Sequence, residues 1–135
     1  MTLTFIIAVI VFAVVVLVLL NLVAKPAVQG IDKAHFIHEW NDIVAMSKDE
    51  KTYSTSVMSA DKLLDEALKG LGYKGETMAE RMVAAKNRLK NKDELWRAHK
   101  VRNQIVHESK FKINEKQVKQ ALWAYQRAFK DLGVI

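Results

Sequence analysis

Hydrophobic residues divide this chain into one continuous apolar segment at its N-terminus and a series of periodic segments after it. Residues 3–24 read LTFIIAVIVFAVVVLVLLNLVA, with no charge and with only Thr4 and Asn21 as polar interruptions. At 1.5 Å per residue, a helix of this length reaches roughly 33 Å, which matches a hydrocarbon core of roughly 30 Å. The pattern predicts a transmembrane anchor over residues 1–24, in contact with the membrane through residues 3–24.

Two other interpretations of the apolar segment fit the sequence less well. A secretory signal peptide has a shorter apolar region, a preceding cation and a small-residue cleavage site, and the residues before Lys25 show none of these. A buried core helix would have to be enclosed by the remaining residues, about 110 in number, which are too few to cover so uniformly apolar a rod. Lys25 and Lys33 follow the segment and no Lys or Arg precedes it, so the positive-inside rule predicts a single-pass protein of the cell membrane with a cytoplasmic C-terminal domain.

A short linker over residues 25–30, in which Pro26 ends the apolar helix, leads to residues 31–135. Apolar residues three and four positions apart predict helices over about 32–48 and 53–69. Thr77 and Glu80 have the spacing of a capping box that begins a third helix, which continues through Leu89. Asp93 is the expected N-cap of a fourth helix, and Asn114, with Gln117 three residues later, caps a fifth.

No segment alternates long enough to predict a strand, so the expected fold is all-α. It consists of an N-terminal transmembrane helix followed by a compact five-helix bundle. Trp40, Trp96 and Trp123 fall on apolar stripes and are expected to pack in the core.

The positive charge of the chain belongs to one region. Residues 86–119 contain 11 Lys and Arg against 4 Asp and Glu, a net of +7, whereas the whole chain carries +6. Lys86, Arg88, Lys90 and Lys100 are candidate phosphate-binding residues for RNA. Two alternatives are attraction to anionic lipid headgroups and an ordinary solvated helix face.

Several classes of site are not predicted. The absence of cysteine excludes disulfides, thiolate catalysis and zinc held by cysteine. His35 and His38 are three residues apart, but no third ligand follows at a fixed spacing, so no metal site is predicted. The glycines form no nucleotide-binding motif, and no cofactor is expected.

Candidate chemistry lies on the fourth expected helix. His99, Asn103 and His107 share one face at i, i+4 and i+8, and the long side chain of Arg102 can lean toward them. Imidazole transfers protons near neutral pH, and guanidinium can hold a phosphate with two hydrogen bonds. A purely structural interpretation is equally open. In it, His107 interacts with the helix dipole, Asn103 satisfies buried backbone groups, and Arg102 pairs with an acid. Candidate acids for that pair are Asp65 and Glu66.

The hexapeptide RNQIVH, Arg102 to His107, resembles the R-x4-6-H motif of HEPN domains, with the Asn after Arg that many members share. The wider sequence is similar to small bacterial membrane proteins that join one N-terminal anchor to an HEPN-like domain over residues 31–135. The resemblance implies a homodimer and metal-independent RNA cleavage. In that reaction His107 is the general acid or base, Arg102 stabilises phosphate charge, and Asn103 orients His107 or the substrate. His99 lies outside the motif, and its role would be auxiliary.

Some HEPN domains bind nucleotides or mediate assembly without cleaving RNA. The expected function is therefore RNA or nucleotide engagement at the membrane, with ribonuclease activity as one form of it. The alternative is a non-enzymatic adaptor that assembles with itself or with another protein at the cytoplasmic face of the membrane.

Overall fold

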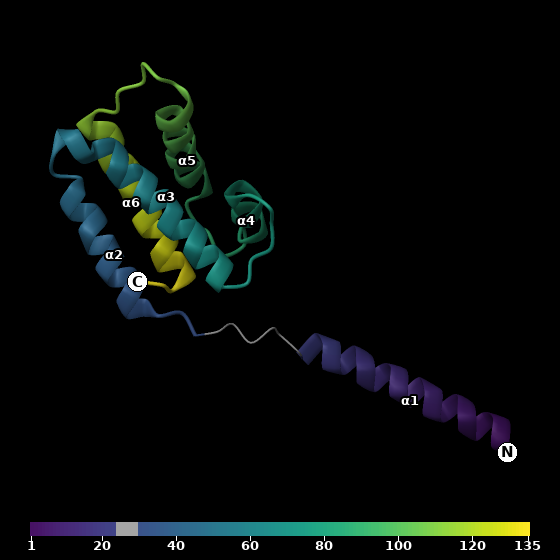
Figure 1. The fold of residues 1–135 in the computed structure, drawn as a ribbon. Helices are drawn as coiled ribbons and strands as arrows, with labels where there is room; N and C mark the ends of the chain where they lie inside the picture. Colours follow the sequence, from purple (N-terminus) through teal and green to yellow (C-terminus); the bar gives the residue numbers. More distant parts are fainter. Residues whose placement is uncertain (24–29) are drawn as a thin grey trace.

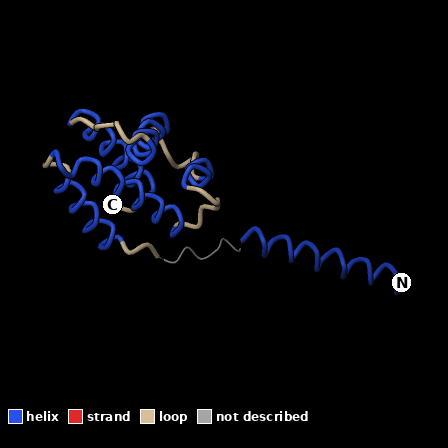
Figure 2. Tube along the Cα trace, turned by 45° about the horizontal axis from the view of Figure 1, so that its top comes forward, coloured by secondary structure: helices blue, strands red, loops and turns tan. Residues whose placement is uncertain are grey.

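The computed structural model describes residues 1–23 and 30–135 (Figure 1). Most of the expected linker, residues 25–29, lies outside the described residues. Within the described ranges the regular structure is helical, and Figure 2 shows no strand there, so the prediction of an all-α chain is confirmed. The helices are α1 Thr2–Val23, α2 Lys33–Met46, the 3-10 helix η1 Glu50–Thr52, α3 Tyr53–Gly70, α4 Met78–Ala84, α5 Lys92–His107 and α6 Glu115–Leu132.

Helix α1 is formed by the continuous apolar segment and contains 22 residues. Its described side chains run from Leu3 to Leu19, and all of them are exposed except Val16, which is half-buried. Over the residues whose side chains are described, no helix has both the length and the apolar character needed to cross a membrane.

Helix α3 is the centre of the bundle and packs against α2, α4, α5 and α6. Its Leu64 and Leu68, with Tyr125 and Phe129 of α6, are among the largest fully buried side chains. Trp40 of α2 meets the Phe129 ring edge-on at 5.4 Å and is buried, as expected. The expectation for the other two tryptophans was wrong. Trp96 and Trp123 are 39% and 48% exposed, because neither lies on the buried face of its helix.

The helix starts confirm the capping motifs that the sequence predicted. At α4 the Thr77 hydroxyl accepts the Glu80 backbone N–H, and the Glu80 carboxylate accepts the Thr77 N–H. Asn114 and Gln117 make the same reciprocal pair at α6. Each box satisfies two backbone donors that the first helical turn leaves without partners.

Two boundaries differ from the predicted ones. Helix α4 ends at Ala84 rather than at Leu89, because the chain enters tight turns there, and Leu89 still reaches the core. Helix α5 has Asn91 as its N-cap, two residues before the predicted Asp93. Asp93 therefore lies in the first turn, where a carboxylate interacts favourably with the helix dipole.

Polar contacts between helix ends show how the bundle is oriented. His35 Nε2, near the start of α2, lies 3.0 Å from Glu66 Oε1 near the end of α3. The Lys90 N–H, just before α5, donates to Asp131 Oδ2 near the end of α6 over 2.8 Å. The starts of α2 and α5 and the ends of α3 and α6 therefore lie together, at what we call the linker end, because the chain enters there from Gly30 (Figure 1). The opposite end, called the far end, contains the end of α5.

Candidate functional site

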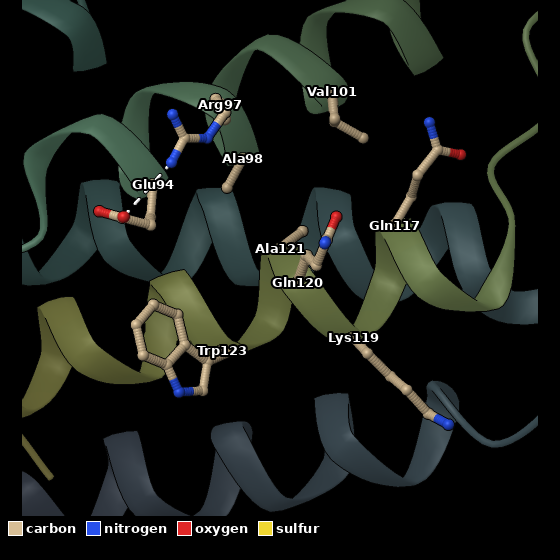
Figure 3. Close-up of a pocket in the computed structure, with 9 residues that line it drawn as sticks. All are labelled: Glu94, Arg97, Ala98, Val101, Gln117, Lys119, Gln120, Ala121 and Trp123. Atoms are coloured by element: carbon tan, nitrogen blue, oxygen red, sulfur yellow. Dashed lines mark ion pairs between the residues drawn. The ribbon is translucent and has the colours of Figure 1, made fainter.

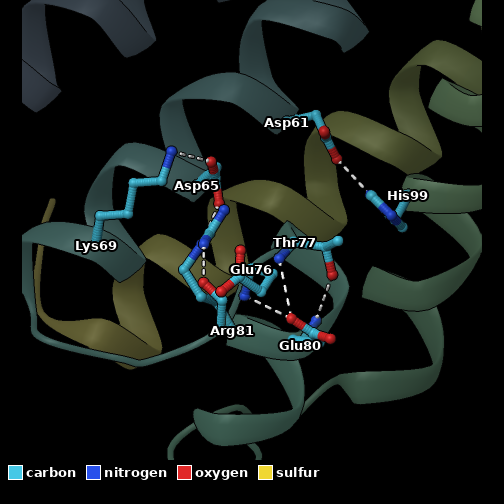
Figure 4. A network of polar contacts seen from close by, with 9 residues as sticks. Asp61, Asp65, Lys69, Glu76, Thr77, Glu80, Arg81 and His99 are labelled. Atoms are coloured by element: carbon cyan, nitrogen blue, oxygen red, sulfur yellow. Dashed lines mark hydrogen bonds and ion pairs between the residues drawn. The ribbon is translucent and has the colours of Figure 1, made fainter.

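The centre of the candidate site is Asp61 of α3, which is only 3% exposed. Tyr125 of α6 donates its hydroxyl proton to Asp61 Oδ1 over 2.8 Å. His99 Nδ1 of α5 lies 2.8 Å from the same oxygen (Figure 4). Arg102 Nε, also on α5, is 3.3 Å from Asp61 Oδ2. A carboxylate this deeply buried requires hydrogen-bonding or cationic partners, because burying it without them costs roughly several kcal/mol. One side chain thus joins α3, α5 and α6.

Tyr125 is kept as a hydrogen-bond donor by its surroundings. Burial raises the pKa of its hydroxyl well above the ordinary value of 10.0. The negative charge of Asp61 and the hydrogen bond to it raise this pKa further, and the charge of Arg102 opposes the change. The phenol is therefore protonated across the physiological range and stays bonded to Asp61.

Arg102 and Asn103 form the polar edge of this network. Arg102 Nη1 donates to Asn103 Oδ1 over 3.0 Å, and the Arg102 side chain is 35% exposed. Arg102 pairs with an acid of α3, as the structural interpretation allows, but this acid is Asp61, one turn before the candidates Asp65 and Glu66. Glu66 instead contacts His35.

Asp65 belongs to a second network that fixes the α3–α4 loop. Arg81 Nε donates to Asp65 Oδ1 over 2.7 Å, Arg81 Nη1 donates to the Gly75 carbonyl, and Lys69 Nζ lies 2.8 Å from Asp65 Oδ2 (Figure 4). Burial by itself raises the pKa of Asp65, but hydrogen bonds and charges from Arg81 and Lys69 outweigh it and hold this pKa below its ordinary value of 3.8. A Cβ on Gly75 would lie 2.7 Å from Glu80 Cβ, so only glycine allows this close approach.

The two networks border one cavity of about 430 Å³ between α3, the α3–α4 loop, α4 and α5. Asp61 and Asp65 face it, but their oxygens already have cationic or hydroxyl partners. Two donors from α5 differ: Arg102 Nη2 and Asn103 Nδ2 make no hydrogen bond to any residue that the structure describes. His99 also lines the cavity, with its Nδ1 directed at Asp61. An anionic oxygen can therefore be bound by residues that need not leave their partners. The lining residues are Asp61, Lys62, Asp65, Glu76, Thr77, Met78, Ala79, Arg81, His99, Arg102 and Asn103.

His107 is separated from this cavity. It is the last residue of α5, it is exposed, and it is not among the lining residues. Five residues along a helix rotate the side-chain direction by about 140°, so Arg102 and His107 of one chain leave α5 on different sides. The structure brings His99, Arg102 and Asn103 together and leaves His107 apart, although all four were expected near one face.

The four candidate phosphate-binding residues are also outside the cavity. Lys86, Arg88 and Lys90 lie in the connection between α4 and α5, and Lys100 lies on the exposed side of α5. None of the four lines the cavity.

Sequence reasoning missed Asp61 and Tyr125. The spacing of Asp61 from apolar residues could have indicated its burial. Asp61 lies four residues after Val57 and three before Leu64, and both of these are fully buried. An acid on the apolar stripe of a helix requires a partner from another element.

Two other features are poorer candidates for a site. A larger cavity of about 620 Å³ lies between α5 and α6, and Figure 3 shows its walls, which include Val101, Ala121 and the exposed Trp123. Its charged pair, Arg97 and Glu94, is an ordinary pair within one helix at 3.3 Å. His38, Glu39 and Asp42 have ligand atoms within 4.8 Å of one another on the surface of α2, an arrangement common without a metal. The remaining lining residues of the larger cavity are Ala98, Gln117, Lys119 and Gln120.

Comparison of the chain with models of known protein families, with curated protein sequences and with solved structures gave no match. The geometry of the networks and the cavity therefore carries the functional argument, and the HEPN resemblance stays a prediction.

Proposed function

We propose that this is a membrane-attached helical protein that binds a phosphate group of RNA or of a nucleotide in the cavity between α3, α4 and α5. The observation that carries the proposal is that Arg102, Asn103 and His99 line this cavity, and that Arg102 Nη2 and Asn103 Nδ2 make no hydrogen bond with a described residue. Asp61 holds two of these side chains, so little conformational entropy is lost when they bind a ligand. Guanidinium and amide groups together suit the oxygens of a phosphate.

Membrane attachment is supported by the sequence of α1. The helix has 22 residues without an acidic or basic side chain, and at 1.5 Å per residue it reaches roughly 33 Å. Most of its described side chains are apolar and exposed, and leaving them in water is unfavourable. The proposal keeps a single span in the cell membrane, with residues 31–135 in the cytoplasm, on the basis of Lys25 and Lys33.

Metal-independent cleavage of RNA is the enzymatic form of the proposal and is supported by the HEPN-like RNQIVH motif. Arg102 and His107 of one chain diverge by about 140° around α5, so one phosphate reaches both only if a second copy supplies one of them. The proposal is therefore a homodimer. Arg102 and Asn103 of one copy hold the phosphate, and His107 of the other assists attack by the ribose 2′-hydroxyl.

A second candidate is a non-enzymatic adaptor, and one observation favours it. Asp61 already holds His99, Tyr125 and Arg102 within the chain, which gives the polar residues of α5 a structural role. In this alternative the cavity binds nothing, and the bundle assembles with itself or with another protein.

Cleavage and binding of a labelled mixed-sequence RNA in EDTA would separate these possibilities. Residues 31–135 are suitable, because they contain every buried apolar residue of the core among the residues whose burial is described. We expect cleavage by this protein, loss of cleavage in His107→Ala, and unchanged cleavage in His38→Ala, whose exposed imidazole lies outside the cavity. Circular dichroism verifies that all three are folded.

The binding half of the experiment uses Asn103→Ala, which removes one free donor and leaves Asp61 with its partners. We expect roughly tenfold weaker RNA or nucleotide binding, the value of one hydrogen bond to a charged group. Binding without cleavage would support the phosphate site and reject the ribonuclease. A folded protein that neither binds nor cleaves would reject both and leave the adaptor.

A further inference from the structure

A cationic segment runs from the connection after α4 to the first residue of α5. Its cations are Lys86, Arg88, Lys90 and Lys92. All four side chains are exposed, and none makes an ion pair with a described residue. No acid occurs between residues 85 and 92. We call residues 86–92 the cationic segment. Its charges form no ion pair with the described residues and are available to an anionic partner.

The backbone of the cationic segment is held in place. Leu89 inserts into the core, the Lys90 N–H donates to Asp131 Oδ2 over 2.8 Å, and the Arg88 N–H donates to the Ala85 carbonyl. The four charges are therefore presented from a fixed loop, and a surface that binds them does not have to order the chain first.

The cationic segment lies at the linker end of the bundle. Its contact with Asp131 places it beside the end of α6, and Lys92 begins α5 (Figure 1). The chain enters at the same end, where the Ile31 side chain lies against Gly70 of α3. Val23, the last residue of α1, and Gly30 are seven residues apart, so at most about 25 Å separates them.

We propose that the cationic segment docks the bundle on the anionic lipid headgroups of the membrane that holds α1. The inference rests on the membrane attachment in the proposed function. Lipid is favoured over RNA as the partner, because the segment lies at the end nearest to the anchor and lines neither of the two cavities described. Each cation near an anionic surface strengthens binding about fivefold, and the effect falls off within about 10 Å.

The absence of cysteine allows a direct test on the full chain. A single fluorophore is attached at Asn87→Cys, within the cationic segment, or at Ser109→Cys, in the exposed loop at the far end. Each protein is reconstituted in phosphatidylcholine vesicles, with or without phosphatidylglycerol, and energy transfer to an acceptor in the headgroups is measured. We expect stronger transfer from Asn87→Cys in the anionic vesicles, lost at high salt, and little change from Ser109→Cys.

Two variants with equal loss of charge serve as test and control. Replacing Lys86, Arg88, Lys90 and Lys92 by Gln should abolish the gain in transfer. Replacing Lys48, Lys110, Lys112 and Lys116 by Gln, four exposed cations at or near the far end, should leave it intact. Circular dichroism checks the fold of both, and neither set makes an ion pair that its loss would break.

The remaining outcomes would overturn the proposal that the cationic segment docks on lipid. Equal transfer in both kinds of vesicle, or equal loss in both variants, overturns the docking surface and leaves the cavity proposal untouched. A signal change at Asn87→Cys on addition of RNA to neutral vesicles would assign the segment to RNA instead. A chain that does not float with the vesicles rejects the membrane attachment, and with it this inference.

Discussion

Asp61→Ala should strongly destabilise the bundle, and the structure gives the size of the effect. The substitution leaves the Tyr125 hydroxyl as a buried donor without a partner, which costs about 1–3 kcal/mol. His99 and Arg102 also lose the carboxylate that they contact, but Arg102 is 35% exposed and water replaces part of its ion pair, so its share is about 1 kcal/mol or less. The Tyr125 and Arg102 contributions sum to about 1–4 kcal/mol, and loss of the His99 contact adds to them. We therefore expect a loss of about 3–5 kcal/mol in the free energy of unfolding, the range for a broken buried pair.

The assay is urea unfolding of residues 31–135 at neutral pH, followed by circular dichroism. Tyr125→Phe is the informative companion, because it removes one hydroxyl, keeps the ring, and should cost only about 1–2 kcal/mol. The double variant Asp61→Ala/Tyr125→Phe has no orphaned phenol, so it should be less destabilised than the sum of the two single variants. Asp93→Ala, at an exposed acid in the first turn of α5, controls for loss of one negative charge and should cost less than about 1 kcal/mol.

Two results would refute this reasoning. A loss below about 1 kcal/mol in Asp61→Ala would mean that the buried carboxylate does not stabilise the junction of α3, α5 and α6. Additive losses in the double variant would mean that Asp61 and Tyr125 are not coupled, in conflict with their 2.8 Å hydrogen bond.

Further predictions concern pH and the α3–α4 loop. Because the pKa of Tyr125 is raised in the folded state, its contribution is fully present below pH 10.0 and is lost as the pH rises above that value, where the unfolded phenol ionises first. The alkaline decline of the midpoint urea concentration should therefore be shallower in Tyr125→Phe, and equal slopes would contradict the burial argument. Because the pKa of Asp65 is lowered, its contribution is present above about pH 3.8 and is lost as the pH falls through the lower, folded value. The stability gap between the wild type and Arg81→Gln should accordingly narrow in acid, and a gap independent of pH would reject the pairing with Asp65. Gly75→Ala should cost about 1–3 kcal/mol through a steric clash, and Gly133→Ala about 1–2 kcal/mol because its φ of 72° is left-handed with open space around it. Thermal melts of both variants measure these losses. A Gly75→Ala protein as stable as the wild type would show that the α3–α4 loop can move to accommodate the added methyl group.

Local chemistry made the helices predictable, and contacts between helices made parts of the site unpredictable. The Thr77 and Asn114 capping boxes involve residues three apart, so their spacing was enough to locate the starts of α4 and α6. The partner of Arg102 is 41 residues away, and the choice between Asp61 and Asp65 depends on which turn of α3 faces α5. The same limit applies to Trp123, whose place outside the buried face of α6 depends on which side of the helix the other helices cover.

The direction of α5 has an electrostatic consequence for a membrane-attached chain. The helix starts beside the cationic segment and has 16 residues, so its last residue, His107, lies roughly 24 Å farther from the linker end. The screening length in physiological salt is about 8 Å, so the negative potential of a bilayer at the linker end falls by roughly three such lengths before it reaches His107. In the membrane-attached arrangement that we propose, a polyanion would approach the motif with little repulsion from the lipid surface. The bundle would then act as a spacer between two anions that would otherwise repel each other.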